Sequence, residues 1–284
     1  MSVHRVLRKW NVRPDKALGQ NFLVDPTILE RIATAARLTP EDVVLEIGAG
    51  TGALTKLLAR DAGRVVALEL DSRLIPVLES ELSEFHNVRV IQGDILTLDP
   101  RALIDETWDP SEGSLPPYKV VANLPYYITS AVLRHLLEAD RKPELMVITV
   151  QREVAERIVA EPGDMSVLAV SVQFYGDPEL LFRIKPGSFY PSPDVESAVL
   201  RVDVHPEPPL PADEIETFFT VVRAGFSQRR KQLHNALNAG LGDRISKQEA
   251  AAGLEEAGID PRRRAQSLSV SDWIDVTQIL KDAI

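Results

Sequence analysis

The sequence lacks cysteine, long apolar runs and an abundance of aromatic residues. With no Cys in 284 residues, disulfides and thiolate metal sites are excluded, and nothing indicates secretion. The first twenty residues are basic but hold no continuous apolar segment, so we expect no signal peptide, no membrane span and a cytoplasmic location. The five His residues are scattered, and no metal site is predicted. Because aromatic residues are only 6% of the chain, two adjacent Tyr at 126 and 127 stand out.

The net charge of −10 makes indiscriminate binding to naked nucleic acid unexpected, but the charge is unevenly distributed. Residues 1–39 hold seven Lys/Arg against three Asp/Glu, whereas residues 40–206 hold 15 against 27. Two tight basic clusters follow, Arg229-Arg230-Lys231 and Arg262-Arg263-Arg264. Either cluster taken alone is typical of an ordinary solvated surface.

From residue 40 onward, short β-branched runs alternate with amphipathic helical stretches. This alternation predicts an α/β fold with a doubly wound, mostly parallel sheet and helices on both faces. The expected strands are 43–48, 64–70, 88–94, 118–124 and 145–151, with a closing pair at 180–184 and 196–204 and a surface loop at 107–117. A Pro-rich linker at 205–214 precedes purely helical periodicity. The predicted parts are an N-terminal arm (1–39), an α/β domain (40–206) and a small all-α domain (207–284).

A glycine-rich turn follows the first expected strand, in VLEIGAGTGALT. Gly48 and Gly50 allow the backbone to approach a ligand closely. At the next two strand ends, Glu69 could hold ribose hydroxyls and Asp94 could accept a hydrogen bond from an adenine amine. S-adenosylmethionine fits this set, with its methionine end over the glycine loop. Two alternatives remain: the glycine spacing also suits a nicotinamide dinucleotide, and both acids could be simple caps.

The fourth expected strand ends in Asn-Leu-Pro-Tyr. An exocyclic adenine amine is a poor nucleophile because its lone pair is delocalised into the ring. The Asn123 side-chain oxygen and the Leu124 carbonyl could accept its two protons and favour a tetrahedral nitrogen. Pro125 would stiffen the turn, and Tyr126 could stack on a base removed from its helix. The plain alternative is a strand followed by an ordinary Pro turn.

Seven segments, in order, resemble motifs of the small-subunit rRNA adenine dimethyltransferases (KsgA/RsmA type). They are LGQNFL, VLEIGAGTGALT, ALELD, QGDIL, NLPYYITS, SFYPSPDVESAV and GFSQRRKQLHNAL, and they span most of the chain. The resemblance implies a Rossmann-like class I methyltransferase with a small helical C-terminal domain. It also implies S-adenosylmethionine-dependent dimethylation of two adjacent adenosines in the 3′-terminal hairpin loop of 16S rRNA. The implied substrate is a partly assembled 30S-type particle, and the implied enzyme is a monomer.

The resemblance also implies roles for individual residues. The arm closes over the methionine end of the cofactor, and Ile95 packs near its adenine. The implied cofactor-binding set is Gln20, Asn21, Leu23, Gly48, Gly50, Glu69, Asp94, Ile95 and Asn123. Phe189 stacks on the target adenine opposite Tyr126, while Asn123, Leu124, Pro125 and Tyr126 form the catalytic motif. Arg229, Arg230 and Lys231, expected on a helix, would reach rRNA phosphates, which fix orientation without reading sequence.

One position departs from the pattern, and several other functions remain open. Asp194 stands where relatives commonly carry Lys, which puts the RNA contact of this segment in doubt. An Erm-type enzyme acting on large-subunit rRNA is the nearest rival, although such enzymes tend to be strongly basic. A DNA adenine methyltransferase, a non-catalytic ribosome assembly factor and a nicotinamide-dependent oxidoreductase are the further alternatives.

Overall fold

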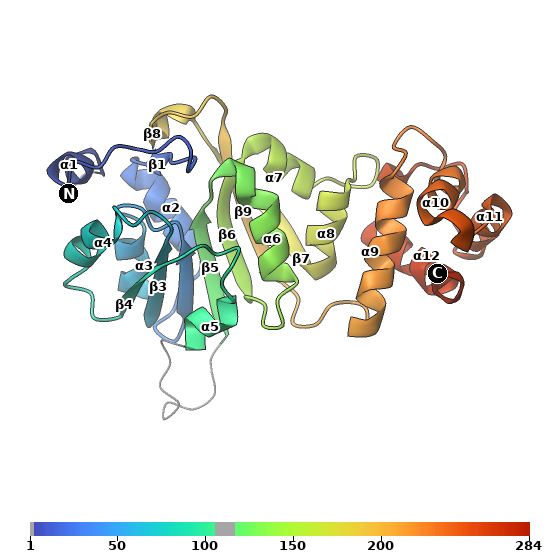
Figure 1. Cartoon of the computed structure of the whole chain (residues 1–284), viewed down its shortest axis with the longest axis horizontal. Coiled ribbons are helices and arrows are strands. Elements are labelled where there is room, and N and C mark those ends of the chain that lie inside the picture. Colours follow the sequence, from blue (N-terminus) through green and yellow to red (C-terminus); the bar gives the residue numbers. More distant parts are fainter. Residues whose placement is uncertain (1–2, 106–116) are drawn as a thin grey trace. The chain divides into compact units, whose positions relative to one another are not determined.

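The computed structural model describes residues 3–105 and 117–284, and Figure 1 shows its elements. The loop predicted at 107–117 lies, apart from Pro117, outside the described residues. The helices are α1 (Val3–Lys9), α2 (Pro26–Ala35), α3 (Thr55–Asp61), α4 (Ile75–Glu81), α5 (Pro100–Asp105), α6 (Thr129–Leu137), α7 (Arg152–Ile158), α8 (Val167–Tyr175), α9 (Ala212–Phe226), α10 (Leu233–Leu241), α11 (Lys247–Glu256) and α12 (Val270–Leu280). The strands are β1 (Phe22–Leu23), β2 (Val43–Ile47), β3 (Arg64–Glu69), β4 (Val88–Gln92), β5 (Tyr118–Asn123), β6 (Leu145–Gln151), β7 (Gly176–Ile184), β8 (Phe189–Tyr190) and β9 (Ser197–Val204).

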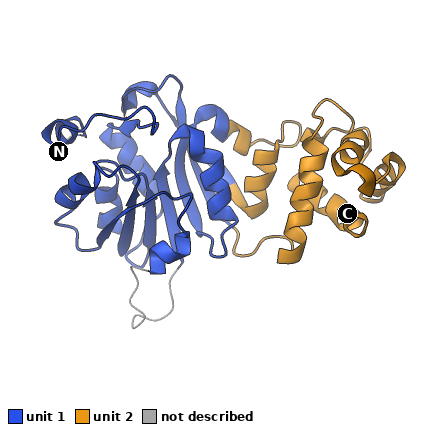
Figure 2. Ribbon diagram, viewed as in Figure 1, with its two compact units in different colours: residues 1–155, 178–204 blue, residues 156–177, 205–284 orange. Residues whose placement is uncertain are grey.

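The chain forms two compact units (Figure 2). The first comprises Met1–Ala155 and Pro178–Val204, and the second comprises Glu156–Asp177 and His205–Ile284. The N-terminal arm therefore lies in the same unit as the sheet, and the segment containing α8 joins the C-terminal helices. The functional division into 1–39, 40–206 and 207–284 remains a prediction.

A seven-stranded sheet is the centre of the first unit, with strand order β4-β3-β2-β5-β6-β9-β7. Strands β2 to β6 are parallel, and β9 runs antiparallel to β6. The chain passes from β2 to β3 and β4 on one side and then returns to place β5 on the other side of β2. This reversal leaves a crevice at the carboxyl ends of β2 and β5, where α/β sheets bind ligands. The predicted fold class is confirmed.

The inner parallel strands β2, β3 and β5 are almost continuous runs of buried apolar residues because helices cover both faces of the sheet, whereas the edge strand β4 is only partly buried. Alternate residues point to one face, so Val44, Val65 and Val121 share a core cluster with Leu58 of α3 and Ile32 of α2. Burying one such side chain fully contributes about 1.5–3 kcal/mol relative to leaving it exposed. The core thus fixes the strand ends that carry the candidate site.

The second unit is helical, as predicted for the C-terminal part. Its core contains stacked Phe174 and Phe218, with ring centroids 4.4 Å apart, and the fully buried Trp273. Gly240 lets α10 approach α9, since a Cβ there would lie only 2.5 Å from the Ala224 Cα. The helix α9 begins at Ala212, inside the predicted linker, because Pro211 sits well just before a helix. Among the described residues, no helix is long and apolar enough to cross a membrane.

Candidate active site

A cavity lies at the carboxyl ends of β2, β3, β4 and β5, on the first unit. It brings together residues predicted from four separate strand ends and from the arm. Those predicted residues are Gln20, Asn21, Gly48, Gly50, Glu69, Asp94, Ile95, Asn123, Leu124, Pro125, Tyr126 and Phe189. Leu23 differs from them because its side chain is buried in the core and lines a smaller neighbouring hollow with Glu46.

The glycine loop after β2 forms one wall of the cavity. Gly48 and Gly50 have φ angles of 78° and 61°, in the left-handed region that favours glycine. A Cβ on Gly50 would lie 3.2 Å from the ring of Phe22, and a Cβ on Gly48 would lie 3.5 Å from the Asn123 carbonyl oxygen. Side chains here would therefore fill the cradle, and the loop suits a ligand held against bare backbone.

Glu69, at the end of β3, is oriented by the backbone around it. Its Oε2 accepts a hydrogen bond from the Gly50 N–H at 2.7 Å, and its Oε1 accepts one from the Asp71 N–H at 2.9 Å. Burial raises the pKa of Glu69, and these two backbone donors oppose that effect. An ionised carboxylate offers about four acceptor positions, so two hydrogen bonds leave capacity for a pair of ribose hydroxyls.

Asp94 and Ile95 follow β4 and line the same cavity. The Asp94 Oδ1 accepts a hydrogen bond from the Leu96 N–H at 2.9 Å, which fixes the side chain in a tight turn. Its other carboxylate oxygen can accept a hydrogen bond from a ligand amine. Ile95 is buried and supplies an apolar surface beside it. This combination fits a purine ring with an exocyclic amine.

The Asn123 side chain, at the end of β5, is turned by the arm. Its Nδ2 donates to the Asn21 carbonyl oxygen at 3.0 Å, across 102 residues of sequence. Since a carbonyl only accepts, the amide nitrogen must face the arm, and Oδ1 is left as an acceptor. The sequence indicated that Asn123 would present an oxygen but not that the arm backbone would orient it.

Tyr126 and Phe189, the two residues predicted to stack on the base, are each held in place by a contact with another strand. The Tyr126 hydroxyl lies 2.7 Å from the Ser197 Oγ of β9, and burial raises the pKa of this phenol, which keeps it neutral. Phe189 is buried and pairs with Leu23 in the small β1–β8 sheet. Tyr127, which was assigned no role from sequence, lines the same cavity although its side chain is largely exposed.

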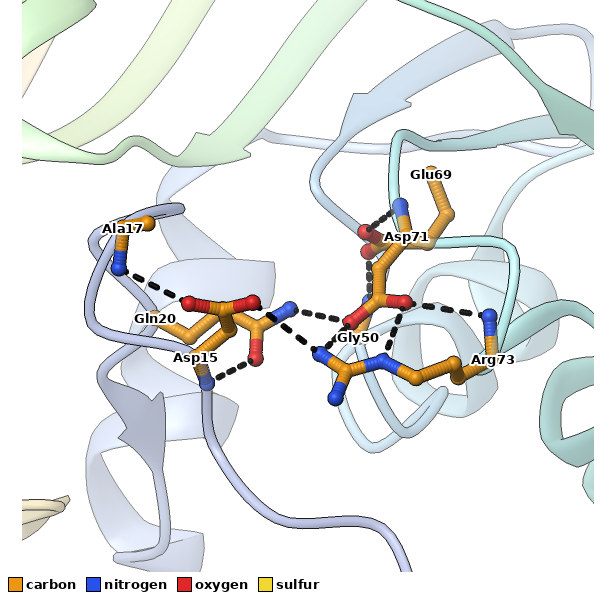
Figure 3. A network of polar contacts seen from close by, with 7 residues as sticks. All are labelled: Asp15, Ala17, Gln20, Gly50, Glu69, Asp71 and Arg73. Atoms are coloured by element: carbon orange, nitrogen blue, oxygen red, sulfur yellow. Dashed lines mark hydrogen bonds and ion pairs between the residues drawn. The ribbon is translucent and has the colours of Figure 1, made fainter.

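The arm is fastened over the cavity by a network centred on Asp71 (Figure 3). The Gln20 Nε2 donates to the Asp71 Oδ2 at 2.8 Å, and the Gln20 Oε1 accepts from the Asp15 N–H at 2.8 Å. Arg73 donates to both oxygens of Asp71, at 2.8 and 2.6 Å, and lies 3.7 Å from the Asp15 carboxylate. The Arg73 side chain holds the pKa of Asp71 below its ordinary value. Asp71 thereby connects the arm to Glu69, because its side chain binds Gln20 and its backbone N–H donates to Glu69.

Two sequence interpretations change in the structure. Arg229, Arg230 and Lys231 lie not on a helix but in the exposed turn between α9 and α10, because the α-helix ends at Phe226. The Asp71 network was not predicted, although Asp71 stands in the quoted ALELD motif. Its partner Gln20 is 51 residues away in sequence, so only the fold reveals the contact.

Adenosine-containing cofactors bind in α/β sheets where the strand order reverses, as it does between β2 and β5. Here the ends of three strands suit an adenosine, and the end of the fourth presents an amide oxygen to the same cavity. The cradle at Gly48 and Gly50, the spare acceptor capacity of Glu69 and the Asp94–Ile95 pair fit S-adenosylmethionine. The chain is thus an S-adenosylmethionine-dependent methyltransferase.

Comparison with known proteins narrows this class. The family model described as ribosomal RNA adenine dimethylase matches residues 12–282. The chain is 46% identical over 94% of its length to the ribosomal RNA small subunit methyltransferase A of Dehalococcoides mccartyi, covering 89% of that protein. It is 44% identical over 97% of its length to the protein of that name from Moorella thermoacetica, covering 96% of it. The chain therefore belongs to the ribosomal RNA adenine dimethylase family, and the resemblance inferred from seven motifs is confirmed.

Solved structures of related enzymes share the fold. A dimethyladenosine transferase from Plasmodium falciparum superposes with a TM-score of 0.78 at 25% identity, covering 92% of this chain and 98% of that one. The 23S rRNA methyltransferase ErmE superposes with a TM-score of 0.73 at 29% identity, covering 92% of this chain and all of that one. The fold alone therefore does not separate small-subunit from large-subunit substrates, whereas the relatives at 44–46% identity carry the small-subunit name.

Proposed function

We propose that this chain dimethylates the exocyclic amines of two adjacent adenosines in the 3′-terminal hairpin loop of 16S rRNA. The observation that carries the proposal is the orientation of Asn123. Its Nδ2 is engaged by the Asn21 carbonyl, so its Oδ1 is the atom available to an amine. The family and the small-subunit name of the relatives support the choice of 16S rRNA.

The residues of the cavity would act by holding the target nitrogen. The Asn123 Oδ1 and the Leu124 carbonyl accept its two protons, which favours a tetrahedral nitrogen with its lone pair exposed. Tyr126 and Phe189 stack on the two faces of the extruded base. When bound, S-adenosylmethionine supplies an electrophilic methyl group, and Gln20, Asn21, Gly48, Gly50, Glu69, Asp94 and Ile95 would hold it, with Leu23 behind them. The proton leaves the amine only after attack, so no strong base is required.

The second unit would provide contacts to rRNA phosphates. Arg229, Arg230 and Lys231 are exposed, and none forms an ion pair with another residue of the described part of the chain. The Leu233 N–H donates to the Arg263 carbonyl at 2.7 Å, which brings the second basic cluster against the start of α10. Such contacts position a substrate without reading its sequence. We propose a partly assembled 30S-type particle as the substrate, a cytoplasmic location, and a monomer as the active form.

The proposal is tested by measuring transfer of labelled methyl groups to unmethylated small subunits. Asn123→Ala should lower the transfer rate at least a hundredfold, the typical loss for a preorganised polar group at a reacting atom. Binding of S-adenosylmethionine, measured by calorimetry, should largely persist and shows that the variant is folded. Near wild-type transfer by this variant would refute the assignment of Asn123. Preferential methylation of free large-subunit RNA would instead favour the Erm-type alternative.

A further inference from the structure

The arm carries four cations that have no ion-pair partner in the described part of the first unit. Arg5, Arg8, Arg13 and Lys16, which we call the arm cations, are exposed, and none forms an ion pair with another described residue. Other basic residues near the N-terminus are engaged instead. Lys9 lies 3.6 Å from Glu81, Arg37 lies 3.2 Å from Asp203, and the Arg31 guanidinium lies 3.6 Å from the Phe182 ring centroid. In a chain with a net charge of −10, unpaired cations concentrated on one segment form a local positive surface.

The helix α1 holds part of this surface in a fixed orientation. Val3, Val6 and Leu7 are buried in one cluster with Phe22 and Leu74. Their i, i+3 and i+4 spacing places them on one side of the helix. The same spacing puts Arg5 and Arg8 on a neighbouring, solvent-facing side, with His4 beside Arg8. The positive face is therefore presented by a packed helix.

The helix that carries this face packs close to the active-site cavity, because Phe22 belongs to its buried cluster and also lines the cavity. The His4 ring centroid lies 4.7 Å from that of Tyr190, and Tyr190 pairs with Phe22 in the β1–β8 sheet. Phe189, the neighbour of Tyr190, lines the cavity itself. Figure 1 shows α1 next to the β1–β8 pair. The segment that contributes Phe189 carries one exposed base, Lys185, and one exposed acid, Asp194, which offset each other, so most of the net positive charge here comes from the arm.

We propose that the arm cations, led by Arg5 and Arg8 on α1, bind the sugar–phosphate backbone of the RNA next to the extruded base. The proposal rests on the proposed function for the identity of the RNA. Phosphate contacts at the rim would fix the strand while the base enters the cavity, and would do so independently of base sequence. The arm cations would then explain how a protein with a negative net charge binds RNA close to its active site.

The test compares Arg5→Gln/Arg8→Gln with a matched control, Arg37→Gln/Arg60→Gln. Both double variants remove two positive charges and keep much of each side chain. The control arginines are already paired, with Asp203 and Glu30, and they lie near the amino ends of the strands, opposite the cavity. Binding of a synthetic 3′-terminal 16S hairpin is measured at several KCl concentrations. Each lost phosphate contact lowers the slope of log affinity against log salt by about 0.7 and, near 0.15 M salt, the affinity by about fourfold.

We therefore expect the Arg5/Arg8 variant to lose about tenfold in hairpin affinity, with a smaller salt slope, while the control stays near wild type. Its dissociation constant for S-adenosylmethionine should match the wild type because neither residue lines the cavity. An unchanged salt slope would overturn the proposal. So would weakened binding to whole small subunits with unchanged hairpin binding, because that result would indicate a protein partner. If the wild type binds the hairpin but transfers no methyl group to unmethylated small subunits, the proposed function fails while the binding result still stands.

Discussion

The buried carboxyl of Glu46 gives a quantitative test of the interior beneath the glycine loop. Its side chain is only 2% exposed, and its Oε2 has no hydrogen-bond partner among the described residues. Burial raises the pKa of Glu46 to about 8, the nearby Thr55 hydroxyl opposes this effect, and the negative charge of Glu69 adds to it. The carboxyl is thus expected to be protonated in the folded enzyme at neutral pH.

The sign of the resulting pH dependence follows from linkage. Below the ordinary Glu pKa the group is protonated in both states and costs nothing. Above it, the unfolded chain ionises while the folded chain holds the proton, so stability falls by about 1.4 kcal/mol per pH unit until the folded pKa is passed. Glu46→Gln keeps the size and removes the titration. Relative to wild type, its free energy of unfolding should rise by about 4 kcal/mol between pH 5 and pH 8.

The assay is urea unfolding of both proteins without cofactor at pH 5, 6, 7 and 8, followed by far-UV circular dichroism. Only the difference between the two proteins is used, because Glu69 and the other titrating groups are present in both and largely cancel. A difference that stays constant across this range would show that Glu46 ionises normally, and the description of its environment would be wrong. If the Gln variant is already less stable than the wild type at pH 5, its amide lacks an acceptor; this offset is independent of pH, so the change in the difference between pH 5 and pH 8 remains the test.

Two further predictions concern the arm and the second unit. Asp71→Asn should weaken the charged attachment of Gln20, raising the S-adenosylmethionine dissociation constant several-fold and speeding tryptic cleavage at Lys16; unchanged values in calorimetry and proteolysis would show that the arm is held elsewhere. Gly240→Ala should lower the free energy of unfolding by about 1–3 kcal/mol because its Cβ would lie 2.5 Å from the Ala224 Cα. Gly187→Ala, which has open space around it, is the control, and equal melting temperatures for the two variants would contradict the close helix contact.

Much of the sheet could be predicted because its strands are short apolar runs bounded by clear turns. The run 145–151 was predicted with the same bounds that β6 has in the structure. The helix α8 was not predicted, and its composition explains why. Its sequence VLAVSVQFY is apolar on nearly every side, so it shows no amphipathic period. The two-residue strands β1 and β8 are too short for any periodicity and exist only because distant segments meet.

The candidate site was predictable to the extent that each contribution is local. Gly48, Glu69, Asp94 and Asn123 each lie at or just after the end of an expected strand, so the sequence places them at the carboxyl edge of the sheet. Because the strands are parallel, these ends lie side by side. Hydrogen bonds that orient those residues are not local. Asn123 is turned by Asn21, and Asp71 is reached by Gln20, and neither pairing leaves a spacing in the sequence.

Charge shows the same difference between sequence and structure. The sequence gives seven basic residues in 1–39 but not which of them are already neutralised. The fold pairs Lys9 and Arg37 with acids and leaves Arg5 and Arg8 exposed on α1. An exposed ion pair presents little field to a phosphate, whereas an unpaired cation presents its whole charge. We therefore expect the affinity for RNA to depend on the few unpaired cations. An overall negative charge of the chain then does not prevent the enzyme from binding an RNA substrate.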